Sequence, residues 1–336
     1  MNKLGKQTIK FKNPPVIIGS YAVVGEKEGQ GTFKDYYDHI LKDDFFGEKT
    51  FEHAERKIME HAVTHAIDKA NLQSSDIELI VSGDLLNQII SSSFTARHFD
   101  IPFLGLYGAC STMAESLAVG ACMVDGGYYN NVICSTGSHF SSAERQYRFP
   151  LELGNQRPPT SQWTVTGAAC SVLANCGKGC RITYATFGRV TDYGVKDVNN
   201  MGAAMAPAAM RTLIEHFKDT KRKQEDYDLI LTGDLGKLGS EILMDLMEHE
   251  GYKFGKNYND CGQMIFSNDQ RPFQGGSGSA CSAVVLNSYI YDKLKKGELK
   301  KVLFCATGAL LSTLSSQQGD SIPGICHAVV IESGEE

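Results

Sequence analysis

Two stretches of this sequence, Asp76–Gly83 (DIELIVSG) and Asp226–Gly233 (DYDLILTG), decide the fold. Each stretch is a short apolar run, and each is followed directly by Asp-Leu. An apolar run that does not alternate with polar residues is typical of a strand covered on both faces. The matched pair indicates that the chain contains one structural unit twice.

An apolar stripe of helical period precedes each of these strands, as expected for a helix that packs on a sheet. The first stripe consists of Ile58, Ala62, Val63, Ala66, Ile67 and Ala70. The second consists of Ala209, Leu213, Ile214 and Phe217. We predict that the second helix begins near Pro207, because proline is tolerated in a first helical turn.

A second pattern also occurs in both halves. Gly108–Ser111 (GACS) opens a helix of small residues and is followed by a strand at Val132–Gly137. Ser279–Ser282 (SACS) opens a similar helix and is followed by a strand at Leu303–Gly308. The helix cysteine and the strand cysteine are 24 positions apart in each half. Motif, order and spacing together predict a duplicated α/β unit.

The alternation of strands and helices predicts parallel strands joined by right-handed crossovers. We therefore expect an α/β protein with two similar halves stacked as alternating helix and sheet layers, αβαβα. The halves are expected at residues 1–180 and 181–336, with a loop excursion at 138–165. Three prolines and weak periodicity mark the excursion as a loop.

Composition and charge exclude several classes of protein. The formal net charge of −6 and the lack of a basic stripe argue against nucleic-acid binding. The polar N-terminus has no apolar core of a secretory signal, and no stretch reaches the ~18 apolar residues of a membrane-spanning helix. We expect an intracellular, soluble protein whose membrane role, if any, is peripheral.

The ten cysteines lie mostly in apolar runs or among small residues, which is typical of buried, reduced thiols. Cys170, Cys176 and Cys180 lack the paired spacing of a metal site. No metal and no cofactor is predicted.

Cys110 is the candidate reactive residue. The sequence Gly105–Ser111 is consistent with a strand end, a tight turn and a helix start. The unpaired N–H groups and positive dipole of a helix N-terminus are predicted to lower the pKa of this thiol. The same pattern is equally compatible with a packed structural cysteine.

The two-half pattern with a GACS turn before a buried helix resembles the thiolase and ketoacyl-synthase superfamily. In that superfamily a cysteine in this turn accepts the acyl group, which implies this position for Cys110. The resemblance also implies a histidine after the strand that ends at Gly233, and an asparagine or histidine in the turn at Gly275–Ser279. This chain has Asp234 and Ser277 there. The resemblance therefore implies that the nucleophile position is kept, its partners are lost, and the protein is not an enzyme.

The alternative is an acyl-CoA-dependent acyltransferase or condensing enzyme that uses Cys110 as nucleophile with a displaced base. His139, at the exit of a predicted strand, is the candidate for that base or for a pocket residue. His327 lies in an apolar terminal strand and is expected to be a core histidine.

In detail, Gly188–Gly194 (GRVTDYG) and Met201–Pro207 (MGAAMAP) resemble a family of stage V sporulation proteins of spore-forming bacteria. The resemblance implies binding of dipicolinic acid (pyridine-2,6-dicarboxylate) for its uptake into the developing spore. It also implies a link to spore germination, a place at the inner membrane of the forespore or spore, and other stage V sporulation proteins of the same operon as partners. We further expect a twofold homodimer joined at a sheet edge.

The predicted ligand-binding residues are Cys110, His139, Asp84, Asp234 and Ser277. A helix N-terminus favours anionic groups, whereas the two aspartates would oppose a dianion unless calcium accompanies it or unless they cap helices. Two further residues, Arg145 and Arg148, have two interpretations: they supply positive charge at the site, or they are ordinary loop residues.

Overall fold

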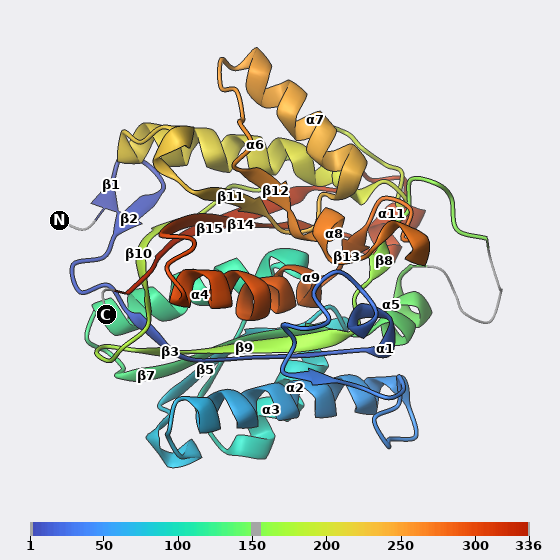
Figure 1. Cartoon of the computed structure of the whole chain (residues 1–336). Coiled ribbons are helices and arrows are strands. Elements are labelled where there is room, and N and C mark those ends of the chain that lie inside the picture. The colour runs from blue at the N-terminus through green and yellow to red at the C-terminus, as the bar shows by residue number, and fades with distance from the viewer. Residues whose placement is uncertain (1–2, 149–155, 335–336) are drawn as a thin grey trace.

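Helices and sheets alternate in layers in the computed structural model, which describes residues 3–148 and 156–334 (Figure 1). Helices α6 (Met201–Thr220) and α7 (Gly236–His249) form one outer layer. Helices α2 (Phe51–Lys69) and α3 (Ile90–Phe99) form the other outer layer. Between the two sheets lie α4 (Thr112–Asp125) and α9 (Ser279–Val285). This arrangement confirms the predicted αβαβα layers.

Both sheets repeat one strand order. In the first half it is β6-β5-β7-β9-β3, and in the second half it is β12-β11-β14-β15-β10. The strands of the first half are β3 (Val16–Val24), β5 (Leu79–Gly83), β6 (Phe103–Gly105), β7 (Asn131–Ser138) and β9 (Gly167–Ala174). Those of the second half are β10 (Cys180–Thr186), β11 (Leu229–Thr232), β12 (Tyr258–Asp260), β14 (Lys301–Ala309) and β15 (Gly324–Glu332). The five strands of one half match the five strands of the other both in their order along the chain and in their order across the sheet. This match is what a duplicated unit requires.

The predicted parallel pairing is wrong for one strand of each half. β5 pairs in parallel with β6 and β7, and β11 pairs in parallel with β12 and β14. In contrast, β9 runs antiparallel to β3 and β7, and β15 runs antiparallel to β10 and β14. The connection that leads into β9 or β15 leaves and re-enters the sheet at the same end, so it needs no crossover.

Each outer helix layer packs on its sheet through the predicted stripe. In α2, the stripe residues Ile58, Ala62 and Val63 are buried. The helix is capped by Thr50, whose side chain accepts a hydrogen bond from the His53 N–H. The middle helix α4 is buried on most of its surface, which explains its run of small residues.

The predicted start of the second stripe helix is wrong. α6 begins at Met201, where the Asn200 side chain accepts a hydrogen bond from the Ala203 N–H, and Pro207 lies inside the helix. The buried face starts at Met201, and packing of this face outweighs the loss of one backbone hydrogen bond at Pro207.

The predicted loop excursion contains regular structure. It holds α5 (Phe140–Gln146) and β8 (Trp163–Thr164), while residues 149–155, including Pro150, lie outside the described residues. β8 pairs with β13 (Gly276–Ser277) of the second half. The excursion therefore reaches across to the glycine-rich turn that was predicted to belong to the site.

The first residues of the chain extend the second half rather than the first. β1 (Lys3–Leu4) pairs with β2 (Thr8–Lys10), and β2 pairs with β10. The two sheets also meet, since Cys180 and Arg181 of β10 pair with the start of β3. The remaining described α-helices and strands are α1 (Glu26–Gly29), β4 (His39–Ile40), α8 (Cys261–Met264), α10 (Tyr291–Lys295) and α11 (Thr313–Gln317), and a π-helical turn lies at Leu286–Ile290. Among the described helices, none has the length and apolar character that crossing a bilayer requires.

A close backbone approach joins the two halves at Gly308. A Cβ atom at Gly308 would lie 2.5 Å from the Gly108 carbonyl oxygen and 3.1 Å from the Ser111 nitrogen. Backbone atoms cannot swing away as a side chain does. We predict that Gly308→Ala lowers the free energy of unfolding by about 1–3 kcal/mol, measured by urea denaturation.

The matched control for this prediction is Gly255→Ala. Gly255 is exposed, and a Cβ there would meet only the Asn257 side chain, at 3.2 Å. Equal stability of the two variants would contradict the close approach at Gly308.

Candidate functional site

Cys110 lies in a single 3₁₀ turn, Ala109–Ser111, directly before α4. Ala109 has a positive φ of 50°, which bends the chain sharply between β6 and α4. The turn is held by the Ser111 side chain, which donates a hydrogen bond to the Gly108 carbonyl oxygen at 2.7 Å. Cys110 is 5% exposed and forms part of the wall of a cavity.

That cavity has a volume of about 280 Å³ and lies between the two halves. Its apolar wall consists of Leu85, Met201, Ala309, Leu310 and Leu311. Its polar wall consists of Asp84, Asn87, Tyr107, Gln146, Tyr147, Arg148, Ser312 and Thr313, with Ala109 and Cys110 beside them. Such a mixture is typical of a small-molecule site, in which apolar groups bury the ligand and polar groups orient it.

Asp234 and Ser277 lie directly behind this wall. The Asp234 carboxylate accepts hydrogen bonds from Ser277 Oγ at 2.8 Å, from the Gly278 N–H at 3.1 Å and from Thr307 Oγ1 at 2.9 Å. The Cys110 thiol interacts electrostatically with this carboxylate. The structure therefore brings three of the predicted site residues, Cys110, Asp234 and Ser277, into one cluster.

The prediction that the helix N-terminus lowers the pKa of Cys110 is wrong. Burial raises this pKa well above its ordinary value, and the Asp234 charge raises it further. Arg148 and the Gly278 N–H act in the opposite direction without reversing the shift. Cys110 is therefore a thiol at neutral pH, and the thiol is a poor nucleophile.

The carboxylate of Asp234 is free for this cluster because another aspartate caps its turn. Asp260 accepts hydrogen bonds from the Leu235 N–H at 2.9 Å and the Gly236 N–H at 3.0 Å. Burial raises the pKa of Asp234, while its interactions with Ser277, Cys110, Gly278 and Thr307 favour the charged form. The capping role considered for Asp234 thus belongs to Asp260.

Asp84 occupies the matching position of the first half and does act as a cap. Its carboxylate accepts hydrogen bonds from the Leu86 N–H at 2.9 Å and from the Ser92 N–H, in the first turn of α3, at 2.7 Å. Asp84 also lines the cavity. These N–H groups favour the charged form of Asp84, although burial raises its pKa.

His139 is placed away from the cavity wall. Its Nδ1 atom accepts a hydrogen bond from the Ser141 N–H at 3.1 Å, and its Nε2 atom lies 2.7 Å from the Asp44 carbonyl oxygen. Both ring nitrogens are therefore engaged in capping α5 and holding the loop before α2. This placement contradicts a pocket role, and burial lowers the pKa of His139.

The described part of the cavity wall contains no histidine. The prediction of a core position for His327 is confirmed, because it is 8% exposed and its Nδ1 atom accepts a hydrogen bond from the Gly188 N–H. Burial lowers the pKa of His327 to about 4.

Of the two candidate arginines, only Arg148 reaches the site. Its Nη2 atom donates a hydrogen bond to Ser277 Oγ at 2.8 Å, and Arg148 lines the cavity. Arg145 instead forms an ion pair with Glu52, in which the Arg145 side chain is 43% exposed. Arg148 therefore links the cavity wall to the Asp234 cluster.

Sequence reasoning missed two site residues in the predicted loop. Gln162 donates hydrogen bonds to the backbone carbonyls of Asp234 at 2.7 Å and Gly276 at 2.9 Å, and so holds both turns of the cluster. Tyr147 lines the cavity. Its hydroxyl and the Nε atom of Arg148 are buried without a hydrogen-bond partner in the described structure. Nothing in the proline-rich sequence of the predicted loop indicated a role for Gln162. Tyr147 was indicated only by its neighbour Arg148, which was a candidate for positive charge at the site.

These features favour binding over condensation chemistry. Tyr147 and Arg148 line a cavity with an apolar wall, and each carries a buried donor that has no partner among the described residues. An unsatisfied buried donor costs about 1–3 kcal/mol. In contrast, the neighbour of the thiol is a carboxylate, which opposes a developing negative charge instead of stabilising it.

Comparisons with known proteins agree over the whole chain. A family model described as stage V sporulation protein AD matches residues 5–332. The stage V sporulation protein AD of Bacillus subtilis (strain 168) is 46% identical over 332 residues, which cover 99% of this chain and 98% of that protein.

Solved structures of similar fold are thiolase-like. Acetamide-bound OleA of Xanthomonas campestris has a TM-score of 0.62 at 11% identity, covering 96% of this chain and 100% of that chain. The 3-oxoacyl-[acyl-carrier-protein] synthase III of Aquifex aeolicus VF5 has a TM-score of 0.57 at 13% identity, covering 95% of this chain and 99% of that chain. At these identities the likeness establishes the fold alone, and that fold is the predicted one.

The Cys110–Asp234 contact generates a direct prediction. In Asp234→Asn the negative charge beside the thiol is removed, so the pKa of Cys110 falls toward its ordinary value. We expect alkylation of Cys110 by iodoacetamide, followed by mass spectrometry as a function of pH, to begin at lower pH than in the unmodified chain.

The experiment is run in a Cys176→Ser background, since Cys176 is exposed and reacts first. Asp192→Asn, a change of charge at an exposed position, is the control and should leave the profile unchanged. An unchanged or slower reaction in Asp234→Asn would show that its carboxylate does not hold the thiol protonated.

Proposed function

This chain belongs to the stage V sporulation protein AD family, and we propose that it is a non-catalytic binding protein for dipicolinic acid that serves uptake of this compound into the developing spore. The proposal rests on one observation: within residues 3–148 and 156–334, the Arg148 Nε atom and the Tyr147 hydroxyl are buried donors without partners, and both residues line the cavity beside Cys110. A carboxylate of the ligand supplies the missing acceptor. A hydrogen bond to a charged group of this kind contributes about 1.5–3 kcal/mol.

The chemistry of the walls supports a flat aromatic dianion. The ring of dipicolinate would lie against Met201 and Leu311, and one carboxylate would meet Arg148 and Tyr147. The second carboxylate would meet the neutral donors of Asn87, Ser312 and Thr313. Asp84 does not prevent this, because its two oxygens already accept backbone N–H groups. In this proposal a calcium ion is not required for binding.

A dianion does not cross the hydrocarbon core of a bilayer unaided. We therefore propose that the protein passes dipicolinate to other stage V sporulation proteins of the same operon at the inner membrane of the forespore. There it would act as a peripheral protein during sporulation, and the same contacts would serve release of dipicolinate in germination.

An acyl-transfer function is the alternative, and one observation favours it: Cys110 lies on the wall of the cavity. Against it stand the raised pKa of the thiol and the carboxylate at the position of a base. Intact mass after incubation with several acyl-CoAs decides between the two proposals. A Cys110 adduct that turns over would support the enzyme and overturn the non-catalytic function.

The binding proposal predicts that Arg148→Met weakens dipicolinate binding about 10- to 100-fold, because one charged donor is lost. Isothermal titration calorimetry measures the affinity. Fluorescence provides a second readout, since the single tryptophan, Trp163, lies in the strand that pairs with Gly276–Ser277.

Arg145→Met is the matched control. It removes the same charge three positions earlier, at an exposed ion pair, and should bind dipicolinate as the unmodified chain does. An absence of binding to the unmodified chain at millimolar dipicolinate would overturn the proposal. Equal affinities of the two variants would overturn the assigned carboxylate position.

We also propose that the chain forms a twofold homodimer through β6. Among the described strands, β6 pairs only with β5, so its other edge is free to pair with a second copy. Apolar side chains surround this edge: Leu104 is 37% exposed, Ile90 is 40% exposed and Tyr107 is 61% exposed. Because Tyr107 also lines the cavity, the dimer would cover part of its entrance.

Leu104→Lys is predicted to convert the dimer into a monomer, because a lysine on a strand edge opposes edge-to-edge pairing. Light scattering coupled to size-exclusion chromatography measures the mass. Leu314→Lys, at a residue that is 65% exposed and lies on α11, is the control and should remain dimeric. A monomeric unmodified chain would refute the dimer.

A further inference from the structure

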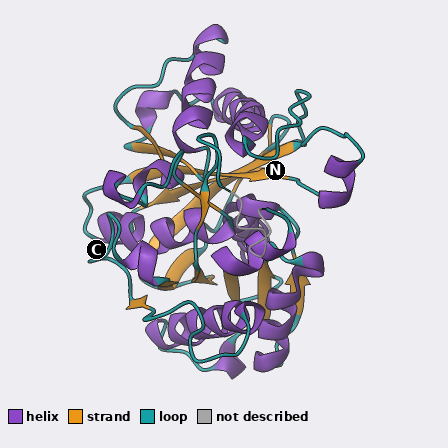
Figure 2. Cartoon of the chain, turned by 90° about the vertical axis from the view of Figure 1, so that its right-hand side faces the viewer, coloured by secondary structure: helices purple, strands orange, loops and turns teal. Residues whose placement is uncertain are grey.

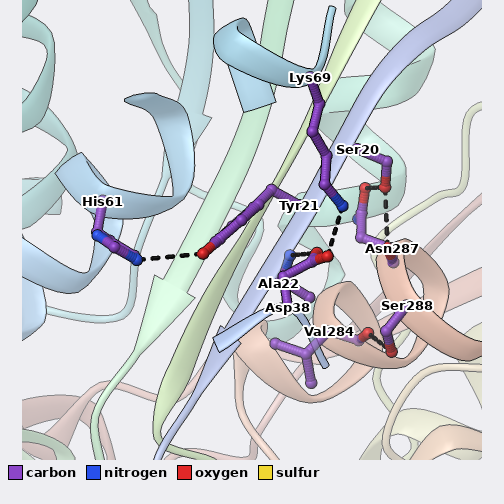
Figure 3. Close-up of polar contacts among 9 residues, drawn as sticks. All are labelled: Ser20, Tyr21, Ala22, Asp38, His61, Lys69, Val284, Asn287 and Ser288. Atoms are coloured by element: carbon purple, nitrogen blue, oxygen red, sulfur yellow. Dashed lines mark hydrogen bonds and ion pairs between the residues drawn. The ribbon is translucent and has the colours of Figure 1, made fainter. Parts of the chain in front are cut away.

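A second cavity, of about 350 Å³, lies at the outer edge of β3 and shares no lining residue with the cavity beside Cys110. It is enclosed by β3, the end of α2, the loop before β4, the π-helical turn and α10. Its walls are mainly polar and include Ser20, Asp38, Lys69, Asn287, Asp292 and Lys295. Figure 3 shows four of these residues converging from different elements.

The floor of this cavity is a strand edge without a neighbour. Of the described strands, β4 covers β3 only at Val23–Val24 and β10 covers it only at Val16–Ile17. Ala22 shows which way the backbone faces: its N–H donates to Asp38 Oδ2 at 2.9 Å, and its carbonyl accepts from the Asp38 N–H at 3.1 Å. Ser20, two residues earlier, faces the same way, so its N–H and carbonyl point to the open edge.

Two irregularities open this space. The pairing of β3 with β9 shifts by one residue between Ile17 and Gly19, which is a β-bulge. On the facing side, the helix after α9 widens into a π-helical turn at Leu286–Ile290. Such turns are frequently found at functional sites.

The π-helical turn is held firmly in place. Asn287 Oδ1 accepts a hydrogen bond from Ser20 Oγ at 2.9 Å (Figure 3). It also accepts one from Ser171 Oγ at 2.6 Å, and Asn287 Nδ2 donates to the Ala283 carbonyl at 3.0 Å. The irregular backbone is therefore specified by side-chain contacts. The cavity is a stable feature of the fold.

Charges of both signs surround the open edge, and they balance. The lining contains Lys69 and Lys295 together with Asp38 and Asp292. Lys69 pairs with Asp38 at 2.5 Å, and Asp292 pairs with Lys296 at 2.7 Å. Partly exposed ion pairs of this type contribute little and exchange readily with a ligand. Lys295 is exposed and has no ion pair within the described residues.

We propose that this second cavity binds a short zwitterionic peptide of two or three residues in extended form. The peptide amide would bond to the N–H and carbonyl of Ser20, as a strand added to a sheet edge does. The terminal carboxylate would pair with Lys295 and Lys69, and the terminal ammonium with Asp292 and Asp38. The balanced lining disfavours a dianion, so this ligand differs in class from that proposed for the cavity beside Cys110.

The test uses diglycine as the probe, with the unmodified chain, in calorimetry and saturation-transfer NMR. N-acetyl-diglycine lacks the ammonium and diglycine amide lacks the carboxylate, whereas free glycine lacks the internal amide. We expect saturable binding of diglycine, with each of the three comparison compounds at least tenfold weaker, which corresponds to about 1.4 kcal/mol or more.

Variants locate the site. Lys295→Ala and Asp292→Asn should each weaken diglycine binding at least fivefold. Lys293→Ala, which removes the same charge from α10 at a residue outside the lining, should not. Thermal melting of each variant shows whether the fold is intact, and Arg148→Met should bind diglycine as the unmodified chain does.

Three outcomes would overturn the proposal. One is an absence of diglycine binding at about 10 mM, well above the affinity expected of a specific site. Another is equal binding of the blocked compounds, which would show that the termini are not recognised. The third is that Arg148→Met loses diglycine binding while Lys295→Ala keeps it, which would place diglycine in the cavity beside Cys110.

Discussion

The carboxylate of Asp234 accepts hydrogen bonds from Ser277, Gly278 and Thr307 and lies against the thiol of Cys110. The thiol comes from the first half, and the carboxylate and its donors come from the second, so the contact exists only when the two halves are stacked. Burial and the neighbouring charge both keep the sulfur protonated. The cavity beside this pair is lined by Arg148 and Tyr147, and Cys110 forms part of its wall.

Duplication of the unit explains how such a pair arises. Asp84 and Asp234 follow matching strands, yet Asp84 caps its own turn and α3, whereas Asp234 does not cap. In the second half, Asp260 at the end of β12 provides the cap instead. Once capping is supplied from another strand, the aspartate after the strand is free to face the other half. Asp84 and Asp234 therefore occupy equivalent positions in the repeat, but their carboxylates make different contacts.

The layers could be predicted from local motifs, because each motif fixes a strand end or a helix start. The grouping of Asp234 and Ser277 with Cys110 was implied by the resemblance to the thiolase and ketoacyl-synthase superfamily. The antiparallel course of β9 could not be predicted, since it depends on where a connection returns. Gln162 lies in a proline-rich stretch whose pairing partner, β13, is more than a hundred residues away. The pKa of Cys110 was predicted with the wrong sign because a helix N-terminus is a local feature, whereas burial is set by the assembled halves.

Helices lie outside the sheets and also between them (Figure 2). The helix α9 belongs to the middle layer, between the two sheets (Figure 1). It begins directly after Gly278, which holds Asp234, and ends at the π-helical turn that carries Asn287. Asn287 in turn contacts Met113 of α4, the helix that starts beside Cys110. Because every residue of α9 is buried, the helix cannot shift at one end without disturbing the packing of both sheets. The close packing of this middle layer therefore fixes the positions of the thiol, the carboxylate and the floor of the second cavity together.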